Sequence, residues 1–148
     1  GQGRAAGRAL PNIGRLIKES KMDLNKFTER ARGFVQAAQT IAMRENHQRL
    51  VPEHILKALM DDDQGLAANL ITRAGGAPQM VRDANDTAIT KLPQVSGDAG
   101  QPYMDNKTAK VLAEAEALAK KAGDSFVPVE RILMALVIVK SKAKKMKK

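Results

Sequence analysis

The sequence predicts an all-α domain, and two observations carry this prediction. Apolar residues recur at intervals of three and four along most of residues 24–139, which is the spacing of one helix face, and no segment alternates apolar and polar residues over the length of a strand. Proline and glycine interrupt the pattern where helices would begin and end. A chain of 148 residues with 43% hydrophobic and 28% charged residues is typical of one globular domain with a single core.

The first expected helix begins at Leu24 and ends near Asn46. Asp23 or Asn25 can cap its start with a side-chain oxygen, and Asn46 tolerates the left-handed backbone that often ends a helix. The residues expected on its apolar face are Phe27, Ala31, Phe34, Val35, Ala38, Ile41 and Ala42.

Three further helices follow before residue 93. Pro52 suits the first turn of a helix over residues 53–60, a short helix over residues 66–74 ends at Gly75 and Gly76, and Pro78 opens the fourth. The expected inner face of the fourth helix consists of Met80, Val81, Ala84, Ala88, Ile89 and Leu92.

Residues 93–104 are a linker by composition, and the helical pattern then resumes. Asp105 or Asn106 caps a long helix that ends at Gly123, and a last helix covers roughly residues 130–139. The acid-poor start of residues 1–21 is interpreted as a basic, flexible extension, and residues 144–148 as a lysine-rich tail.

The charge lies at the two ends of the chain. The formal net charge is +9, of which residues 1–21 contribute +4 and residues 140–148 contribute +6, so residues 22–139 carry −1. A nucleic-acid binder acting through its tails therefore stays an alternative, although a nucleic-acid partner is not expected. The arginine-rich start is also compatible with an organellar transit peptide, so a mitochondrial location stays open beside a bacterial cytoplasmic one.

Several classes of site lack the residues they need. The chain has no cysteine and only two histidines, His47 and His54, without carboxylate or thiolate partners at ligand spacing, so no metal site is expected. No serine lies in a nucleophile elbow, no phosphate-binding loop of the Walker type occurs, and the longest apolar run is too short to cross a membrane. An enzyme is the least favoured class.

The sequence repeats itself at a constant offset of 77 residues. Residues 27–59 align without a gap on residues 104–136, and Glu53-His54-Ile55-Leu56-Lys57-Ala58-Leu59 falls on Glu130-Arg131-Ile132-Leu133-Met134-Ala135-Leu136. A fixed offset indicates a duplicated unit whose two copies pack on each other. The first repeat would span residues 24–92, and the second, over residues 105–143, has no counterpart of residues 66–92; we expect it to leave extra apolar surface exposed.

Three motifs give this duplication a family resemblance. They are Pro-Glu-His-Ile-Leu-x-Ala-Leu at residues 52–59, Ala-Gly-Gly at 74–76 and, above all, Lys-Leu-Pro-Gln-Val-Ser-Gly at 91–97. Residues 22–143 resemble the amino-terminal domain of the ClpB protein disaggregases. The resemblance implies a tandem pseudo-twofold repeat of four-helix units, here with the second unit incomplete.

The resemblance also implies a function. It suggests a non-enzymatic module that captures exposed apolar segments of unfolded or aggregated polypeptides for a hexameric AAA+ ATPase, which uses ATP and Mg²⁺ and works with the DnaK chaperone system. This chain itself would hold no cofactor. The helix motif is shared with the ClpA and ClpC unfoldases, so an adaptor-binding domain of a protease-linked unfoldase is an alternative.

By the same resemblance, five residues are candidates for substrate binding. They are Thr28, Asp124, Glu130, Leu112 and Leu118. Each polar candidate also has a structural explanation: Thr28 can cap a helix, Asp124 can accept loop amides, and Glu130 can favour a helix dipole. The resemblance implies that substrate segments bind in an apolar groove. Glu114 and Arg131 stand where some relatives carry leucine, so the groove of this chain would be smaller.

Overall fold

The computed structural model describes residues 23–97 and 100–147, and it confirms the all-α prediction for these ranges. The elements follow in the order η1 (Leu24–Lys26, a 3₁₀ turn), α3 (Glu29–Arg44), β1 (Arg49–Leu50), α4 (Pro52–Met60), α5 (Leu66–Arg73), α6 (Pro78–Thr90), β2 (Tyr103–Met104), α7 (Asn106–Ala122) and α8 (Val129–Lys147). The extension predicted for residues 1–21 lies outside the described residues.

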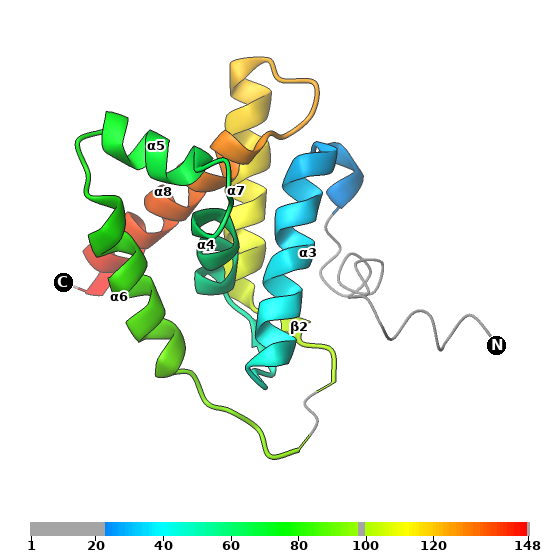
Figure 1. Cartoon of the computed structure of the whole chain (residues 1–148). Coiled ribbons are helices and arrows are strands. Elements are labelled where there is room, and N and C mark those ends of the chain that lie inside the picture. The colour runs from blue at the N-terminus through cyan, green and yellow to red at the C-terminus, as the bar shows by residue number, and fades with distance from the viewer. Residues whose placement is uncertain (1–22, 98–99, 148) are drawn as a thin grey trace.

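Helix α4 occupies the centre of the domain (Figure 1). It packs against α3, α5, α6, α7 and α8, while α7 packs along α8. Both repeats contribute to one apolar core, whose largest fully buried apolar side chains are Phe27, Leu24, Leu50, Ile55, Leu59, Leu112 and Ile132. The two repeats therefore share a single core.

Short backbone pairings join the two repeats reciprocally. Leu50 of β1 lies opposite Met104 of β2 in a parallel pair, and Phe27 lies opposite Val127 in an isolated parallel bridge. Adding or subtracting the offset of 77 converts one pairing into the other. Each repeat thus provides the segment before its first helix and the segment before its second helix to the other repeat, which is the pseudo-twofold arrangement that the sequence predicts.

The ends of the first helix in each repeat also correspond. Asn46 and Gly123 are equivalent positions, and both adopt a left-handed backbone, with φ of 59° and 81°. The next backbone N–H, of His47 or Asp124, returns to a carbonyl of its own helix at 2.9 Å in both cases. This conformation favours asparagine and glycine, which is why the sequence predicted both helix ends.

The start of the first helix differs from the prediction. Helix α3 begins at Glu29 rather than at Leu24, because Thr28 is its N-cap: the hydroxyl of Thr28 accepts the N–H of Ala31 at 3.1 Å. Asp23 caps only the short turn η1. Pairing with the other repeat keeps the backbone extended immediately before α3, and this tertiary contact overrides the apolar periodicity.

The inner face of α6 was predicted correctly at Ile89 but not at Met80, Ala84 or Asn85. Met80 is 73% exposed and Ala84 is exposed, whereas Asn85 and Ile89 are buried. The side-chain amide of Asn85 donates to the backbone carbonyl of Glu53 in α4 at 3.0 Å. A hydrogen-bonded polar residue therefore takes the place that apolar periodicity assigned to its neighbours.

The last helix is longer than predicted. Helix α8 continues to Lys147, whereas the sequence placed its end near Val139. The lysine-rich segment interpreted as a tail is, as far as Lys147, a continuation of this helix. Lysine has a good helix propensity, and a run without proline or glycine contains no signal that ends a helix.

Two buried histidines connect the end of α3 to the start of α4. The backbone N–H of Val51 donates to Nδ1 of His54 at 3.0 Å, so the proton of this ring lies on Nε2, which donates to Nδ1 of His47 at 2.9 Å. Burial, with a smaller contribution from the neighbouring His47, lowers the pKa of His54 to about 4. Burial also lowers the pKa of His47, against an opposing contribution from Glu45. Both rings are therefore neutral at pH 7.

The histidine pair predicts a loss of stability in weak acid. The unfolded chain takes up a proton on His54 near pH 6.5, whereas the folded chain does so only near pH 4. The free energy of unfolding is therefore expected to fall as the pH decreases through this window, by up to about 3 kcal/mol in total. Urea denaturation between pH 7 and 5, above the range where most carboxylates titrate, measures this effect.

A matched variant isolates the contribution of His54. His54→Gln keeps an acceptor for the N–H of Val51 and a donor toward His47 but cannot be protonated in this range. We expect a smaller pH dependence between pH 7 and 5 for this variant. An equal dependence in both proteins would contradict the assignment.

The contact between the repeats can be tested at Thr108. Its hydroxyl, which is fully buried, donates to the carbonyl of Leu50 at 2.6 Å. Thr108→Val preserves the shape and is expected to lower the free energy of unfolding by about 1 kcal/mol. Thr40→Val is the control, since that hydroxyl donates to a carbonyl of its own helix on the exposed surface. If urea denaturation shows the same loss of unfolding free energy for both variants, the hydrogen bond between the repeats does not contribute to stability beyond an exposed one.

Candidate functional site

Thr28, Asp124 and Glu130, the three polar residues singled out from the sequence, gather around Val127. The loop between α7 and α8 lies at the same end of the molecule as the start of α3 (Figure 1), and the backbone N–H of Thr28 donates to the carbonyl of Val127 at 3.0 Å. Asp124 and Glu130 flank Val127 on this loop and on the first turn of α8. The seam between the repeats thus brings together residues that lie far apart in sequence.

Asp124 forms an ion pair with Arg131. The Nε–H of the guanidinium donates to Oδ2 of Asp124 at 2.9 Å, and both side chains are 28% exposed. Loop amides were the structural alternative predicted for this carboxylate, and its partner in the structure is the Arg131 side chain instead. The ion pair joins the end of α7 to the first turn of α8 and fixes the loop between them.

Glu130 is exposed in the first turn of α8, and within the described residues its carboxylate has no hydrogen-bond or ion-pair partner. A carboxylate at this position interacts favourably with the helix dipole. Glu53 occupies the equivalent position of α4 and is half-buried. The two residues share the structural role, but only Glu130 is exposed.

The two leucines named for substrate binding differ in accessibility. Leu112 is fully buried in the core, so its side chain cannot contact a ligand in this structure, and its assignment to the site is wrong. Its position faces the centre of the domain, where α7 packs against α4 and α8. Leu118 is half-buried and packs at the edge of the core.

Phe126 is a residue of this surface that the sequence analysis missed. Its side chain is 56% exposed, while Val127 and Val129, which follow it, are buried. Backbone pairing of Val127 with the first repeat holds the loop and turns the preceding aromatic ring outward. The signal in the sequence was its position between Asp124 and Glu130, and only the structure shows that it points outward.

We define the loop surface as Thr28, Asp124, Phe126 and Glu130. It combines an exposed aromatic ring with a solvated carboxylate on a backbone fixed by pairing and by an ion pair. Such a surface can bind an apolar segment of another polypeptide and contact a neighbouring amide or basic group.

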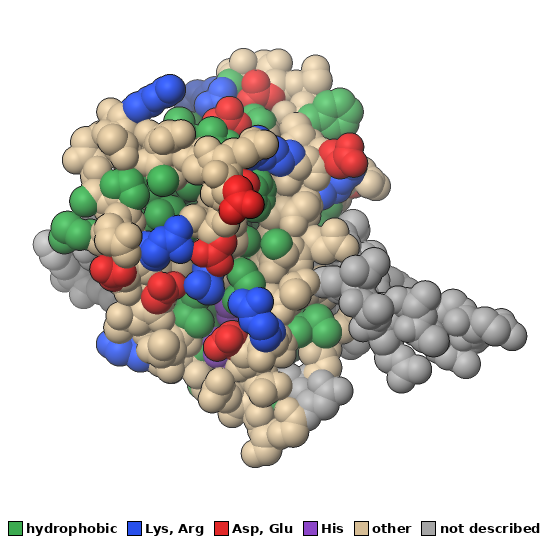
Figure 2. All heavy atoms as spheres, in the orientation of Figure 1, with side chains coloured by type: hydrophobic (Ala, Val, Ile, Leu, Met, Phe, Trp, Pro, Cys, Tyr) green, Lys and Arg blue, Asp and Glu red, His purple; other side chains and the backbone are tan. Residues whose placement is uncertain are grey.

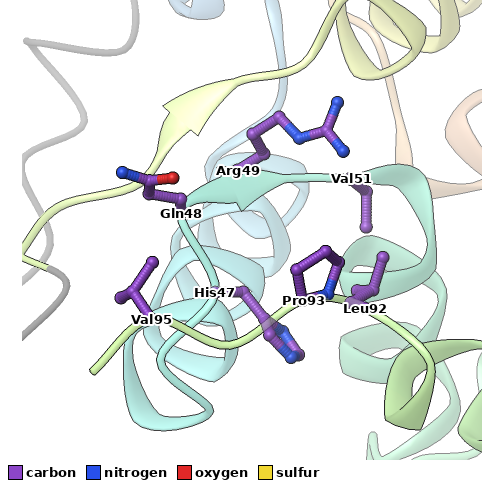
Figure 3. Close-up of a pocket in the computed structure, with 7 residues that line it drawn as sticks. All are labelled: His47, Gln48, Arg49, Val51, Leu92, Pro93 and Val95. Carbon is purple, nitrogen blue, oxygen red and sulfur yellow. The ribbon is translucent and has the colours of Figure 1, made fainter. Parts of the chain in front are cut away.

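A small cavity lies at the opposite end of α3, between the first repeat and the linker. Figure 3 shows Leu92, at the end of the first repeat, and Pro93 of the linker near Val51, with His47 beside them, while Arg49 and Gln48 extend away. Its volume of about 160 Å³ is below the roughly 300 Å³ of typical small-molecule sites. The loop surface is therefore the stronger candidate.

Among residues 23–97 and 100–147, no three or more histidine, aspartate or glutamate side chains are grouped so that they could hold a metal ion. No helix in these ranges combines the length and the apolar composition of a membrane-spanning segment. On the face shown in Figure 2, basic and acidic side chains lie side by side. Among the described residues, Arg30 pairs with Asp62 and Arg82 with Asp61, both at 2.8 Å. This mixed pattern differs from the single-sign patch typical of nucleic-acid binding.

Comparison with known proteins identifies related sequences. The family described as "Clp repeat (R) N-terminal domain" matches residues 26–148. The chaperone protein ClpB of Agrobacterium fabrum is 58% identical over 120 residues, which are 81% of this chain and 14% of that relative. The chain thus spans about one seventh of the length of the curated relatives it matches.

Solved structures show the same fold. The Hsp104 N-terminal domain from Candida albicans superimposes with a TM-score of 0.71 at 22% identity, over 82% of this chain and 79% of that one. The complex of the ClpV N-domain with VipB peptide gives a TM-score of 0.61 at 19% identity, over 76% and 68% of the two chains.

The family match covers most of the described residues, and the pseudo-twofold repeat is present in the structure. The chain therefore belongs to the Clp repeat N-terminal domain family and is similar to the amino-terminal region of ClpB chaperones.

Proposed function

We propose that the chain captures exposed apolar segments of unfolded or aggregated polypeptides through the loop surface. The observation that carries this proposal is Phe126, a half-exposed aromatic ring on a loop that the rest of the fold holds in place. A preorganised loop binds without a large loss of conformational entropy. One aromatic anchor and few directional contacts also suit weak binding to many different sequences.

The relatives support this class of ligand. Similarity to ClpB chaperones favours polypeptide substrates, and a structurally similar ClpV domain was solved with a peptide. Within a longer ClpB-type protein, the chain would deliver substrates to a hexameric ATPase that uses ATP and Mg²⁺ and cooperates with the DnaK system. Because ClpB proteins match this chain at 57–58% identity, substrate capture is favoured over adaptor binding of the ClpA or ClpC type.

Phe126 provides the first test. Phe126→Ser is expected to weaken binding of a fluorescently labelled, carboxymethylated unfolded polypeptide by about tenfold, since a partly buried aromatic contact contributes on the order of 1–2 kcal/mol. Fluorescence anisotropy measures the affinity. Met80→Ser, which removes a 73% exposed side chain from α6, is the matched control and should bind normally. Equal affinities of Phe126→Ser and the unmodified chain would reject the proposal.

Glu130 provides the second test, because Glu53 is its structural equivalent. Glu130→Gln and Glu53→Gln both remove a carboxylate from the first turn of a helix, so each should lower the free energy of unfolding by about 0.5 kcal/mol. If Glu130 contacts the ligand, only Glu130→Gln changes the affinity for the same labelled polypeptide. Unchanged binding by both variants would leave Glu130 with a role in the helix dipole alone.

A further inference from the structure

The guanidinium of Arg131 contacts a residue of the loop surface. Its Nε–H donates to Oδ2 of Asp124 at 2.9 Å, and an Nη1–H donates to the sulfur of Met134, three residues further along α8, at 3.5 Å. A thioether sulfur is a weak acceptor, so the carboxylate is the main partner. The two contacts hold Arg131 against Asp124, beside the proposed binding surface.

This ion pair carries no net charge. The side chains of Asp124 and Arg131 are each 28% exposed, so both charges act on a ligand at the surface, and they act in opposite directions. Glu130, the other carboxylate of the loop surface, is exposed and has no hydrogen-bond or ion-pair partner among the described residues. One of the two carboxylates is therefore available to a basic group of a ligand, and the charge of the other is compensated.

The first repeat shows that charges are not needed to hold such a loop. By the offset of 77, the equivalents of Asp124 and Arg131 are two histidines. His47 and His54 join the same two segments of the first repeat through a hydrogen bond between neutral rings at 2.9 Å. The charges in the second repeat therefore add a property that the connection itself does not require, and they lie where a ligand is proposed to bind.

We propose that Arg131 determines the charge preference of the loop surface. By compensating the charge of Asp124, it prevents this surface from selecting apolar segments that are flanked by lysine or arginine. Only Glu130 then remains to attract a basic group, and the surface accepts apolar segments with different flanking charges. This inference rests on the proposed function and specifies which polypeptide segments the loop surface accepts.

The size of the effect follows from the exposure of the charges. Arg131→Gln removes the positive charge and keeps a side-chain amide that can donate to Asp124. The carboxylate of Asp124 then attracts a basic group of a ligand in addition to Glu130. An attraction between partly exposed charges changes an affinity by about two- to fivefold, and it weakens as salt screens the charges.

Three short, fluorescently labelled peptides measure the preference. They share one apolar core and differ only in the flanking residues, which are lysines, glutamates or serines. Fluorescence anisotropy gives the affinity of the 148-residue chain for each peptide, and the charge preference is the ratio of the affinities for the lysine and glutamate peptides. Arg131→Gln should raise this ratio by about two- to fivefold at low salt and leave the affinity for the serine peptide nearly unchanged. A thermal melt verifies that each variant folds.

Two control variants separate the local charge from the total charge of the chain. Arg49→Gln removes the same charge from another ion pair, Arg49–Asp105 at 3.0 Å. Strand β1, which carries Arg49 and pairs with β2, lies at the opposite end of α3 from the loop surface (Figure 1), so this variant should leave the ratio unchanged. Arg131→Lys keeps a positive charge beside Asp124 and should also leave the ratio unchanged.

A double variant tests the charge balance directly. Asp124→Asn alone leaves the charge of Arg131 uncompensated and should lower the ratio. Asp124→Asn combined with Arg131→Gln removes both charges and should return the ratio to that of the unmodified chain. If Arg131 only holds the loop, Arg131→Gln and the double variant should instead weaken the binding of all three peptides alike.

The outcomes distinguish this inference from the proposed function. An unchanged ratio in Arg131→Gln, or an equal change in Arg49→Gln, overturns the inference, and continued binding of the serine peptide leaves the proposed function in place. Equal weakening of all three peptides also overturns it and assigns Arg131 to the loop structure alone. If the unmodified chain binds none of the peptides, the proposed function fails, and this inference fails with it.

Discussion

The reciprocal backbone pairing between the two repeats is the constraint on which the rest of the structure depends. Leu50 with Met104 and Phe27 with Val127 form two equivalent contacts, and each fixes the segment that precedes a helix of the other repeat. These contacts set where α3 and α7 begin and so align both helices on one core. They also fix the loop that carries Phe126. The proposed binding surface is therefore a direct result of the way the two repeats are joined.

The two repeats use different chemistry at the same place. His47 and His54 form a neutral hydrogen-bonded pair in the first repeat, and Asp124 and Arg131, at equivalent positions, form an ion pair in the second. The histidines are buried, where a charged group would lose its hydration, whereas the ion pair is partly exposed to water. The same pair of positions therefore connects two helices inside the first repeat and fixes a surface loop in the second.

The sequence predicts the features that local chemistry determines. The offset of 77 residues identifies the duplication, and Asn46, Gly123, Pro52 and Pro78 correctly locate helix ends and starts. The sequence-based prediction fails where a tertiary contact determines the structure. Pairing between the repeats moves the start of α3 from Leu24 to Glu29, and a hydrogen bond to α4 buries Asn85. Leu112 is buried in the core rather than exposed at the surface. Periodicity places a residue on one side of a helix, but which neighbour covers that side depends on the assembled domain.

The seam also affects the order in which a ribosome-bound chain can fold. Phe27 is synthesised long before Val127, so the start of α3 remains without its backbone partner until α7 and the following loop have emerged. Contacts between distant parts of a sequence form slowly because a large loop must close first. The first repeat is therefore expected to spend much of synthesis with part of its apolar surface uncovered.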